Sequence, residues 1–500
     1  MDTTIAPGAG GVVASVAQKT VVIELREVDG SYEGQLALFM LVNQLIRLDE
    51  FCPQIVLALP RVPKHPLLRL LPDGSFDEAV LDFMRPFPYA DRVTVNAGAA
   101  TPVSDVVVRV SPDQTGAGMN VWGQGWIAYL NAAPSAPLEP GPPNPVGPTV
   151  ASAFGAAEIF KRLLGEQPMR PGLKVLPLES LTFSAFDYSL TDAANPVLAS
   201  AIDVDGVVVV GLGGIGAGLT AAMASLEAMV GTLWLVDRDE IDITSHNRHL
   251  VSRPGDSGYK VDLARRGLSF HSDLQPKRMW FEEFVQAHGD DHRLVVVGVD
   301  HDRVRREIQG SLPRVILNGG TSDDASLRVT RHDFLRGACL SCISRDDLRE
   351  HPMERQLARQ LGMALDDVLG YWRSGEAVPA EALRQGGILT EQQIEQLAGQ
   401  PMPEIQVRVC AELQLGAGVD EPAVSISFLS ALPGFLLLGE LIKEAQFATG
   451  RPPLNRDTNH AFLSLLGRPH PALLRGRFEK RPDCDCSRAP YVRAYERKWS

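Results

Sequence analysis

The sequence has few basic residues and few cysteines for its length. Its 500 residues contain 48 Lys and Arg against 61 Asp and Glu, which gives a net charge of −13. A surface of that sign does not attract nucleic acid or an anionic membrane, so we expect neither as a partner. Six cysteines are too few for a secreted scaffold of disulfides, so we expect a cytoplasmic protein.

A secretion signal and a membrane span are also absent from the sequence pattern. The first 20 residues carry an acid at Asp2 and no basic region, which is unlike a signal peptide. The most apolar stretch, 424–442, contains Pro433 and Glu440 and predicts a buried core helix. At 45% hydrophobic and 22% charged residues, the composition is typical of a globular protein with two to four domains.

The N-terminal third alternates between strand and helix patterns. Runs rich in β-branched residues predict strands at 21–25, 55–59, 93–95 and 106–110, and apolar periodicity predicts helices at 35–48 and 149–164. Such alternation is typical of a parallel α/β layer. Because no glycine-rich loop follows these strands, residues 1–185 are predicted to be an α/β domain without a nucleotide site.

Residues 186–345 have a sharper α/β pattern. A buried strand at 206–210 precedes a glycine loop at 211–218, a helix at 219–229 and a strand at 232–236, and later strands are expected at 294–299 and 314–317. A charged helical pattern at 346–405 predicts a small insertion. Residues 406–500 are then expected to supply the core helix and a C-terminal tail.

The glycine loop is the strongest local signal. It reads Gly211-Leu212-Gly213-Gly214-Ile215-Gly216, and Asp237 ends the next strand 21 positions after Gly216. Glycines let backbone amides approach a phosphate at a helix N-terminus, and a carboxylate at the second strand end can accept hydrogen bonds from ribose hydroxyls. The pattern predicts nucleotide binding and, by itself, is compatible with an NAD or FAD dehydrogenase.

The run after Asp237 resembles a segment of the E1-type activating enzymes. This superfamily contains the ubiquitin activators and the adenylyltransferases of thiamine and molybdopterin biosynthesis. Asn247 and Arg248 match the last two positions of its Asn-x-Asn-Arg segment, whereas Ser245 stands where the first Asn is usual. Gly258-Tyr259-Lys260 is similar to its Gly-x-x-Lys, and the run from Val299 to Arg305 is similar to its Thr-Asp-Asn-x-x-x-Arg.

The resemblance implies ATP-dependent adenylation. Attack of a carboxylate on the α-phosphate joins two anions, so the site needs cations and a carboxylate that holds Mg²⁺. Arg248, as a catalytic residue, and Lys260 would supply the charge, and Asp300 would hold the metal. The nucleotide-binding set implied in this way comprises Gly211, Gly213, Gly214, Gly216, Asp237, Asp239, Asn247, Arg248, Lys260 and Asp300.

Four of the cysteines form two close pairs. Cys339 and Cys342 are a CxxC pair, and Cys484 and Cys486 are a CxC pair far downstream. Four thiolates can hold one structural Zn²⁺ that clips the tail to the core, and the family resemblance supports this interpretation. A catalytic redox pair is the alternative.

Cys410 lies alone between the helical insertion and the core helix. An isolated cysteine is commonly a small buried apolar residue. The resemblance places near this position the nucleophilic cysteine that takes the acyl group from the adenylate to form a thioester. Cys410 is therefore our candidate acceptor.

Together these features predict an α/β protein of two Rossmann-like adenylation domains, the N-terminal one inactive and the C-terminal one active. A weak internal repeat agrees with this, because Glu158 and Lys161 end one helix and Glu440 and Lys443 end another. Such enzymes work as pairs, so we expect a pseudo-dimer within one chain, with a homodimer also possible.

The expected activity is adenylation of the C-terminal glycine of a ubiquitin-like protein, followed by thioester formation and transfer to an E2-like enzyme. Composition and analogy point to the E1 enzymes of bacterial antiphage conjugation operons. The alternatives are activation of a sulfur-carrier protein, in which Cys410 would form a persulfide or be dispensable, and a non-catalytic nucleotide-binding partner subunit.

Overall fold

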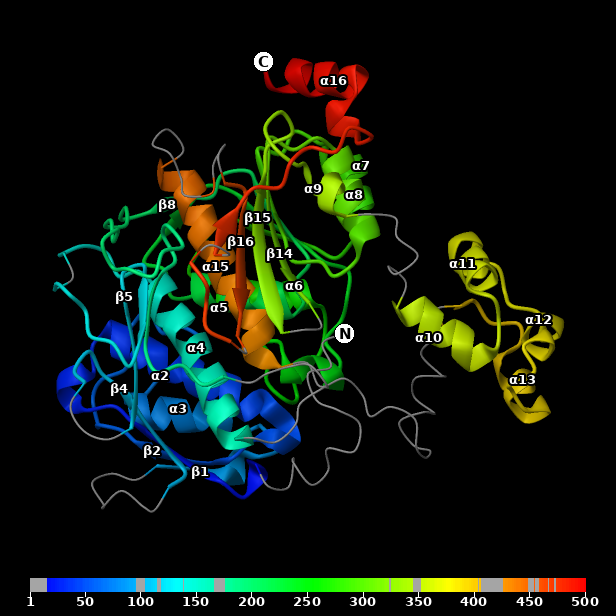
Figure 1. Ribbon diagram of the computed structural model, residues 1–500. Helices are drawn as coiled ribbons and strands as arrows, with labels where there is room; N and C mark the ends of the chain where they lie inside the picture. Colours follow the sequence, from blue (N-terminus) through cyan, green and yellow to red (C-terminus); the bar gives the residue numbers. More distant parts are fainter. Residues whose placement is uncertain are drawn as a thin grey trace. The chain divides into compact units, whose positions relative to one another are not determined.

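The computed structural model places most of the chain in two compact units. One unit is formed by 1–344 with 423–500 and the other by 345–422 (Figure 1). The structure describes residues 16–95, 104–114, 118–137, 139–165, 176–322, 325–344, 352–402, 404–405, 426–447, 454, 458–465, 467–471 and 474–500. The larger unit holds two extensive mixed sheets and the smaller one is helical, so the α/β class expected from the sequence is confirmed.

The first sheet has seven strands in the order β3-β2-β1-β4-β5-β6-β7. Their bounds are Thr20–Glu24 (β1), Gln54–Ala58 (β2), Val93–Val95 (β3), Val106–Val110 (β4), Met119–Gln124 (β5), Ile127–Leu130 (β6) and Leu181–Ser184 (β7). The first five strands pair in parallel, whereas β6 and β7 are antiparallel. The sequence predicted β1 to β4 to within one residue, because their β-branched residues are buried in a parallel sheet.

Helices α2 (Tyr32–Leu45), α3 (Phe76–Met84) and α4 (Val146–Leu164) belong to this half. Ser31 starts α2 as its N-cap, since its side chain accepts a hydrogen bond from the Gly34 amide. Nearly every residue of α2 and α4 is buried, and the two helices pack on each other. Burial all round a helix means that it lies in the interior between other layers.

The second sheet has eight strands in the order β12-β11-β9-β13-β14-β15-β16-β17. Their bounds are Val207–Val210 (β9), Leu233–Val236 (β11), Leu274–Lys277 (β12), Leu294–Val297 (β13), Val315–Thr321 (β14), Ser326–His332 (β15), His460–Ser464 (β16) and Arg475–Gly476 (β17). Its helices are α5 (Gly214–Met223), α6 (Lys260–Gly267), α7 (Phe281–His288), α8 (Asp302–Gly310) and α15 (Ser427–Phe447). A separate two-stranded sheet joins β8 (Ile202–Asp203) to β10 (Met229–Val230).

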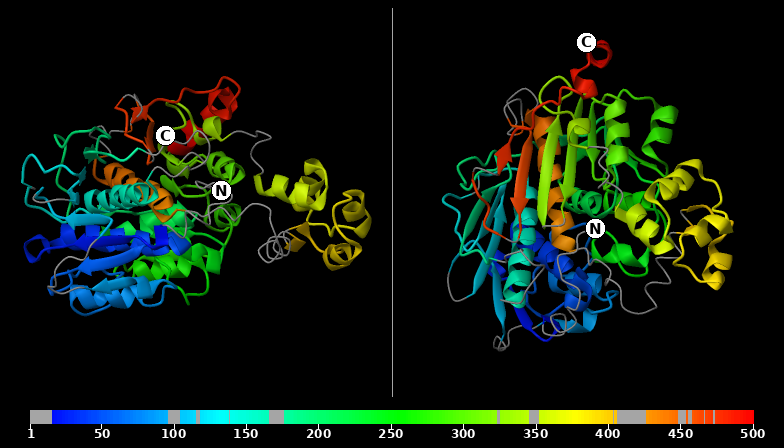
Figure 2. Two further views of the ribbon diagram at one scale, coloured as in Figure 1. Left: turned by 60° about the horizontal axis from the view of Figure 1, so that its bottom comes forward. Right: turned by 45° about the vertical axis from the view of Figure 1, so that its right-hand side comes forward.

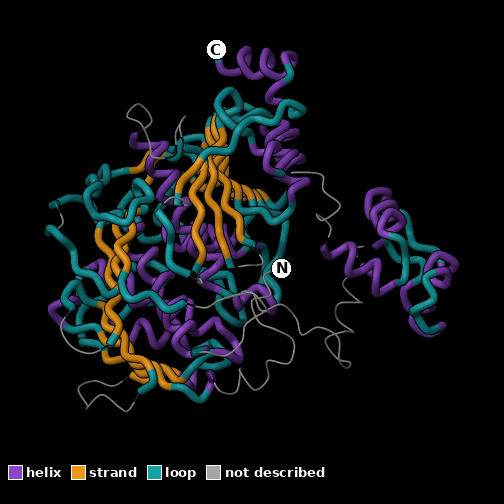
Figure 3. Tube along the Cα trace, viewed as in Figure 1, coloured by secondary structure: helices purple, strands orange, loops and turns teal. Residues whose placement is uncertain are grey.

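The two large sheets share one topology (Figure 3). In each, the first chain strand pairs in parallel with the second and the fourth, and the fifth and sixth are antiparallel. Helix α4 connects the sixth and seventh strands of one sheet, and α15 makes the same connection in the other. Each helix contains a buried ion pair three residues apart, Glu158 with Lys161 and Glu440 with Lys443.

Helix α15 is the core helix that the apolar stretch predicts. It contacts α4 and α5 and also β14 and β15 (Figure 2). Small residues bring α5 and α15 together, because a Cβ on Gly434 would lie 2.3 Å from the Ile215 carbonyl oxygen. None of the described helices combines the length and apolar character that a membrane crossing requires.

Side chains of the N-terminal half reach the end of α5. Tyr32 donates its hydroxyl hydrogen to the Ser225 carbonyl at 2.7 Å, and Arg69 donates to the carbonyls of Ala224, Leu226 and Glu227. A cation at a helix C-terminus satisfies its last carbonyls and complements its dipole. The first half therefore caps the helix that the glycine loop opens.

The smaller unit has its own apolar core. Its helices are α10 (Pro352–Leu361), α11 (Leu365–Ser374), α12 (Ala380–Gln385) and α13 (Glu391–Leu397). Leu361, Val368, Leu383 and Ile394 are buried together. These helices lie in the segment 346–405 for which the charge and leucine pattern predicts a helical insertion.

Candidate functional site

The glycine loop lies at the carboxyl end of β9, the central strand of the second sheet. On either side β9 pairs with β11 and β13, so the loop stands where the strand order reverses. Ligands of open α/β sheets bind at such a switch point. Helix α5 begins at Gly214, five residues before the predicted start, so its first amides belong to the loop itself. These amides and the helix dipole favour an anion there.

Three of the loop glycines are required by the fold itself. Gly211 has a φ of 86°, which only glycine adopts without strain. A Cβ on Gly216 would lie 2.2 Å from the Gly211 carbonyl oxygen, and one on Gly214 would lie 2.8 Å from the Ser430 Cβ of α15. Gly213 differs from them, because a Cβ there would meet no atom of the described protein within 4 Å. The open side of the loop is therefore at Gly213.

This difference predicts opposite effects for two alanine substitutions. We expect Gly213→Ala to fold with a stability within about 0.5 kcal/mol of wild type, since its methyl group meets open space. It should weaken ATP binding at least tenfold, because that space is where a phosphate would lie. Gly216→Ala should destabilise the fold by about 1 to 3 kcal/mol through overpacking. Thermal unfolding and calorimetric titration with ATP check both; equal stabilities of the two variants would contradict the assignment.

Asp237 braces the glycine loop. One carboxylate oxygen accepts a hydrogen bond from the Leu212 amide at 2.6 Å, and the other accepts one from the Asp239 amide at 2.8 Å. Burial raises the pKa of Asp237, and the nearby Lys260 opposes that shift. The sequence predicted Asp237 as a ribose acceptor, and this stays a prediction; in the structure each of its oxygens accepts one hydrogen bond from a backbone amide.

Asp239 is the more accessible acid at this strand end. Its side chain is 54% exposed and accepts a hydrogen bond from Lys260 Nζ at 2.8 Å. It borders a cavity of about 410 Å³. The cavity is lined by Arg238, Asp239, Glu240, Tyr259, Arg278, Met279, Trp280 and Glu283.

Stacked planar groups form one wall of this cavity. The Arg238 guanidinium lies 3.8 Å from the centre of the Trp280 ring, and Arg278 lies 4.7 Å from that of Tyr259. Such faces stack on other planar groups, including nucleobases. Sequence reasoning missed this wall because β12, which carries Arg278 and Trp280 to its carboxyl end, contains Pro276 and was not predicted as a strand.

Arg248 lies against the start of α5. Its Cβ is 3.5 Å from the position that a Cβ on Gly214 would take. Within the described part of the chain, its guanidinium makes no hydrogen bond or ion pair. The neighbouring Asn247 also has a buried side-chain oxygen without a hydrogen-bond partner among the described residues. Both side chains therefore have hydrogen-bonding atoms that no described residue uses.

A short 3-10 helix, η4 (Ile243–Asn247), delivers these two residues. Asp242 caps it by accepting hydrogen bonds from the Ser245 amide at 2.8 Å and the Ser245 hydroxyl at 3.0 Å. Ser245 is the position at which the sequence departs from the family pattern. In the structure the Ser245 hydroxyl is used within η4 itself, because it donates to the Asp242 carboxylate and accepts a hydrogen bond from the Asp242 amide.

Asp300 follows β13, the strand on the other side of the loop. Its side chain is 94% exposed. The next turn is fixed by Arg305, which donates to the Val299 carbonyl at 2.7 Å and pairs with Asp302. Among the described residues, Asp300 has the ionisable side chain of His301 as a neighbour, with His301 Nε2 3.8 Å from Asp300 Oδ1. An exposed carboxylate of this kind is a suitable oxygen ligand for Mg²⁺.

The structure thus brings most of the predicted residues to one edge of the second sheet. The ends of β9, β11 and β13 carry the glycine loop, Asp237 and Asp300, and the segments after β11 add Arg248 and Lys260. Cys410, our predicted acyl acceptor, lies outside the described residues.

The other four predicted cysteines meet in one cluster. Cys339 is the N-cap of α9 (Leu340–Ile343) and Cys342 lies within that helix. Cys484 is the N-cap of η5 (Asp485–Ser487), and Cys486 lies within it. All four sulfur atoms lie within 4.8 Å of one another and are buried. Tetrahedral Zn²⁺ with bonds of about 2.3 Å would hold sulfurs about 3.8 Å apart. The observed separations of 3.4, 3.5 and 3.8 Å fit that geometry.

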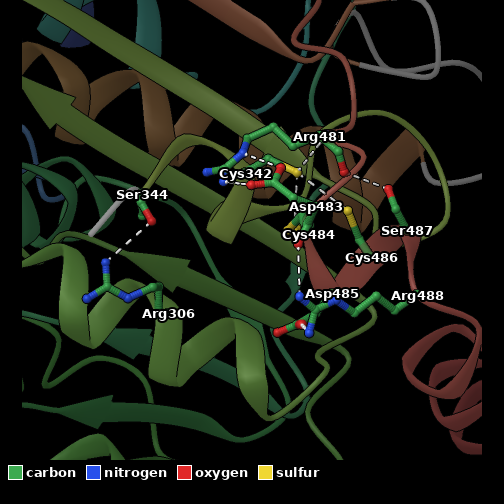
Figure 4. A network of polar contacts seen from close by, with 11 residues as sticks. Arg306, Cys342, Ser344, Arg481, Asp483, Cys484, Asp485, Cys486, Ser487 and Arg488 are labelled. Atoms are coloured by element: carbon green, nitrogen blue, oxygen red, sulfur yellow. Dashed lines mark hydrogen bonds and ion pairs between the residues drawn. The ribbon is translucent and has the colours of Figure 1, made fainter. Parts of the chain in front are cut away.

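The polar surroundings of the cluster suit thiolate ligands (Figure 4). The Arg481 amide donates to Cys342 Sγ at 3.5 Å, while its side chain pairs with Asp483. Hydrogen bonds from Cys339 and Cys342 lower the pKa of Cys486 to about 4. Hydrogen bonds with Cys342 and Cys486, together with burial, raise the pKa of Cys339.

The cluster anchors helix α16 (Ala489–Trp499) to the sheet. Tyr495 stacks on Phe334 at 5.3 Å and donates to the Arg314 carbonyl at 2.8 Å. Trp499 donates to the Leu312 carbonyl at 2.8 Å. The tail is therefore held both by the cysteines and by its own packing.

Comparisons with known proteins leave the family open. No family model matches the chain. An uncharacterised protein of Sinorhizobium fredii, y4jF, is 27% identical over 489 residues, which cover 93% of this chain and 88% of that protein.

Among solved structures, the chain is similar to MccB. The structure of E. coli MccB with ATP matches with a TM-score of 0.33 and 12% identity, over 56% of this chain and 66% of MccB. The microcin C7 biosynthetic enzyme MccB with N-formylated MccA matches with a TM-score of 0.34 and 14% identity, over 57% and 67%. The chain thus spans about two thirds of the length of MccB.

Proposed function

We propose that this protein uses ATP to adenylate the C-terminal carboxylate of a ubiquitin-like protein. The observation that carries the proposal is Arg248, whose side chain has no partner among the described residues and whose Cβ lies 3.5 Å from the position of a Cβ on Gly214, the first residue of α5. A cationic side chain that starts beside a helix N-terminus can bind a polyphosphate there.

In the proposed reaction, the amides of Gly213 and Gly214 and the start of α5 bind the phosphates. Arg248 stabilises the charge that develops when the carboxylate oxygen bonds to the α-phosphorus and pyrophosphate leaves. Lys260 turns from Asp239 toward the phosphates and adds a second cation. Asp300 would hold Mg²⁺, which when bound neutralises phosphate charge.

The cavity next to Asp239 would receive the nucleoside. Trp280 and the two arginines give planar faces for the base, and the exposed carboxylate of Asp239 can accept hydrogen bonds from ribose hydroxyls. This division leaves Asp237 as the residue that holds the loop in shape. A phosphate group at Gly213 and a base at Trp280 then lie at the ends of β9 and β12, on one sheet edge with β11 between them.

The N-terminal half is proposed to be the inactive partner. After β1 the chain has no glycine loop; Arg26 instead pairs with Asp29 and Asp113 and donates to the Ser111 hydroxyl at 3.1 Å. These groups satisfy one another at the strand end that corresponds to β9. A nucleotide would have to separate them, which disfavours binding there.

The later steps rest on the sequence alone. Cys410 would attack the acyl adenylate, forming a thioester and releasing AMP, and an E2-like enzyme would then take the acyl group. Activation in a bacterial conjugation operon remains the setting that we propose for this chemistry.

The test is exchange of labelled pyrophosphate into ATP, with Mg²⁺ and a ubiquitin-like protein that ends in glycine as the candidate carrier. We expect exchange that depends on the carrier and disappears when its C-terminal glycine is removed. An adduct that reducing agent releases should form in wild type and not in Cys410→Ala. ATP binding without exchange by any such carrier would contradict adenylation, and an unchanged adduct in Cys410→Ala would contradict the acceptor.

A further inference from the structure

A fully buried arginine of the N-terminal half holds the segment that carries Arg248. Arg47 follows α2 and is 2% exposed. It donates to the His246 and Ser252 carbonyls at 2.6 Å each and to the Leu250 carbonyl at 3.2 Å. All three acceptors belong to the second half, about 200 positions along the chain.

The environment of Arg47 is costly for a cation. No carboxylate of the described chain pairs with it; the remaining contacts are the Asn43 side-chain oxygen at 2.9 Å and the ring of Phe87 at 4.8 Å. Burial lowers the pKa of Arg47 to about 9. The charge of Asp256 opposes this shift without a direct ion pair, so the buried cation depends on each of its hydrogen bonds being well formed.

The three acceptor carbonyls bracket the candidate phosphate-binding residues. His246 immediately precedes Asn247 and Arg248, and Leu250 and Ser252 follow them. Asn43 adds a fourth bond across the same interface, from its side-chain amide to the Leu250 carbonyl at 3.1 Å. The segment also closes on itself, since the Ser252 hydroxyl and His246 Nδ1 are 3.0 Å apart.

We propose that Arg47 is a positioning residue that fixes the 246–252 segment and thereby aims Arg248 at the nucleotide. This proposal rests on the adenylation proposed above. The N-terminal half, which has no glycine loop, then influences the reaction without touching the nucleotide, because Arg47 holds the backbone segment that carries Arg248. Such action should change the rate of the chemical step more than the affinity for ATP, because fixed geometry matters most in the transition state.

Arg69 provides a matched control. It too belongs to the first half and donates to three carbonyls of the second, but these lie at the far end of α5. Arg47→Met and Arg69→Met each remove one arginine from the same interface. Both should lower the melting temperature of the full chain, and only Arg47→Met should affect the 246–252 segment.

The experiment measures pyrophosphate exchange at varied ATP for both variants. We expect Arg47→Met to lower kcat by about 10- to 100-fold with KM for ATP changed less than threefold, and Arg69→Met to leave kcat within threefold. In the double variant with Arg248→Ala, the Arg47→Met effect should largely vanish, since the two residues act as one unit. Independent, multiplying effects, or equal kcat values for Arg47→Met and Arg69→Met, would overturn the proposal.

Amide hydrogen exchange tests the same proposal without an activity assay. Amides of 246–252 in the unliganded protein should exchange at least tenfold faster in Arg47→Met than in Arg69→Met. Arg47→Lys, which keeps the charge and part of the bonding, serves if the methionine variant does not fold. Unchanged exchange of those amides would contradict the proposal that Arg47 fixes the 246–252 segment. Absence of pyrophosphate exchange in wild type would instead overturn the adenylation proposal.

Discussion

Arg248→Ala should lower the rate of pyrophosphate exchange by about 100- to 1,000-fold, the usual effect of removing one group that stabilises transition-state charge. The melting temperature should stay within about 2 °C of wild type, because the Arg248 guanidinium makes no hydrogen bond or ion pair among the described residues. Steady-state exchange assays and thermal unfolding, measured on the same preparations, check both parts.

Arg265→Ala is the matched control for charge. Arg265 is exposed on α6, so its removal changes the net charge equally and leaves the site intact. It should leave exchange within about twofold of wild type. Arg248→Lys should recover part of the lost rate, since it restores the charge but not the paired donors of a guanidinium. Equal losses of exchange rate in Arg248→Ala and Arg265→Ala would show that the net charge of the protein, rather than the position of Arg248, determines the rate.

We propose that the four cysteines hold Zn²⁺, so Cys342→Ala should abolish zinc binding and destabilise the larger unit by at least about 3 kcal/mol, because binding to four thiolates contributes directly to folding. We expect a loss of stability because Cys342 belongs to the cluster: its Sγ lies 3.8 Å from Cys339 Sγ and 3.4 Å from Cys486 Sγ. Metal analysis of the purified protein and chemical unfolding measure the two effects. The rate of amide hydrogen exchange over 474–500 should rise at the same time, because the cysteine cluster would no longer hold the tail to the core.

Cys52→Ala serves as the control for the cysteine cluster. Cys52 is buried in the first half, where its sulfur lies 3.6 Å from the Pro53 carbonyl oxygen, away from the cluster. The variant should retain one equivalent of zinc. Wild-type protein that contains no zinc after expression in zinc-replete medium, or Cys342→Ala that retains a full equivalent, would rule out the metal site.

The sequence was most informative where the local pattern and the packing agree. Strands β1 and β9 are runs of β-branched residues that a parallel sheet buries on both faces. Strands β2 to β4 are also rich in β-branched residues although one face of each is less buried, so composition alone locates all five. Strands β5 and β6 pair as a hairpin, whereas β7 pairs with β6 across a long stretch of chain that includes α4, and β5 mixes polar and glycine positions with apolar ones. Such pairing is a property of the whole fold that local composition does not encode.

The start of α5 shows how packing overrides propensity. Glycine is a poor helix former, which is why the sequence predicted the helix only from Leu219. In the structure α5 already includes Gly214, Gly216 and Gly218; a Cβ on Gly214 or Gly218 would collide with α15, and one on Gly216 would collide with the Gly211 carbonyl oxygen. The glycines therefore serve both the loop and the contact between two helices.

Residues that act across the two halves were beyond sequence reasoning. Arg47 lies in a helical pattern whose polar positions are usually exposed, and nothing local shows that it is buried against 246–252. The same holds for Trp280, which reaches the cavity only because β12 pairs with β11. The glycine loop and the four cysteines were predictable, since their spacing is short and chemically specific.

The two buried Glu–Lys pairs suggest how this protein evolved. Glu158 with Lys161 and Glu440 with Lys443 occupy equivalent helices of the two halves, whereas only one half has a glycine loop. After duplication of an ancestral gene, selection would have retained the pair in both copies for architecture and released one loop from catalysis. Residues of the released copy could then be recruited to support its twin, and the two copies would have become mutually dependent, as Tyr32, Arg47 and Arg69 now illustrate.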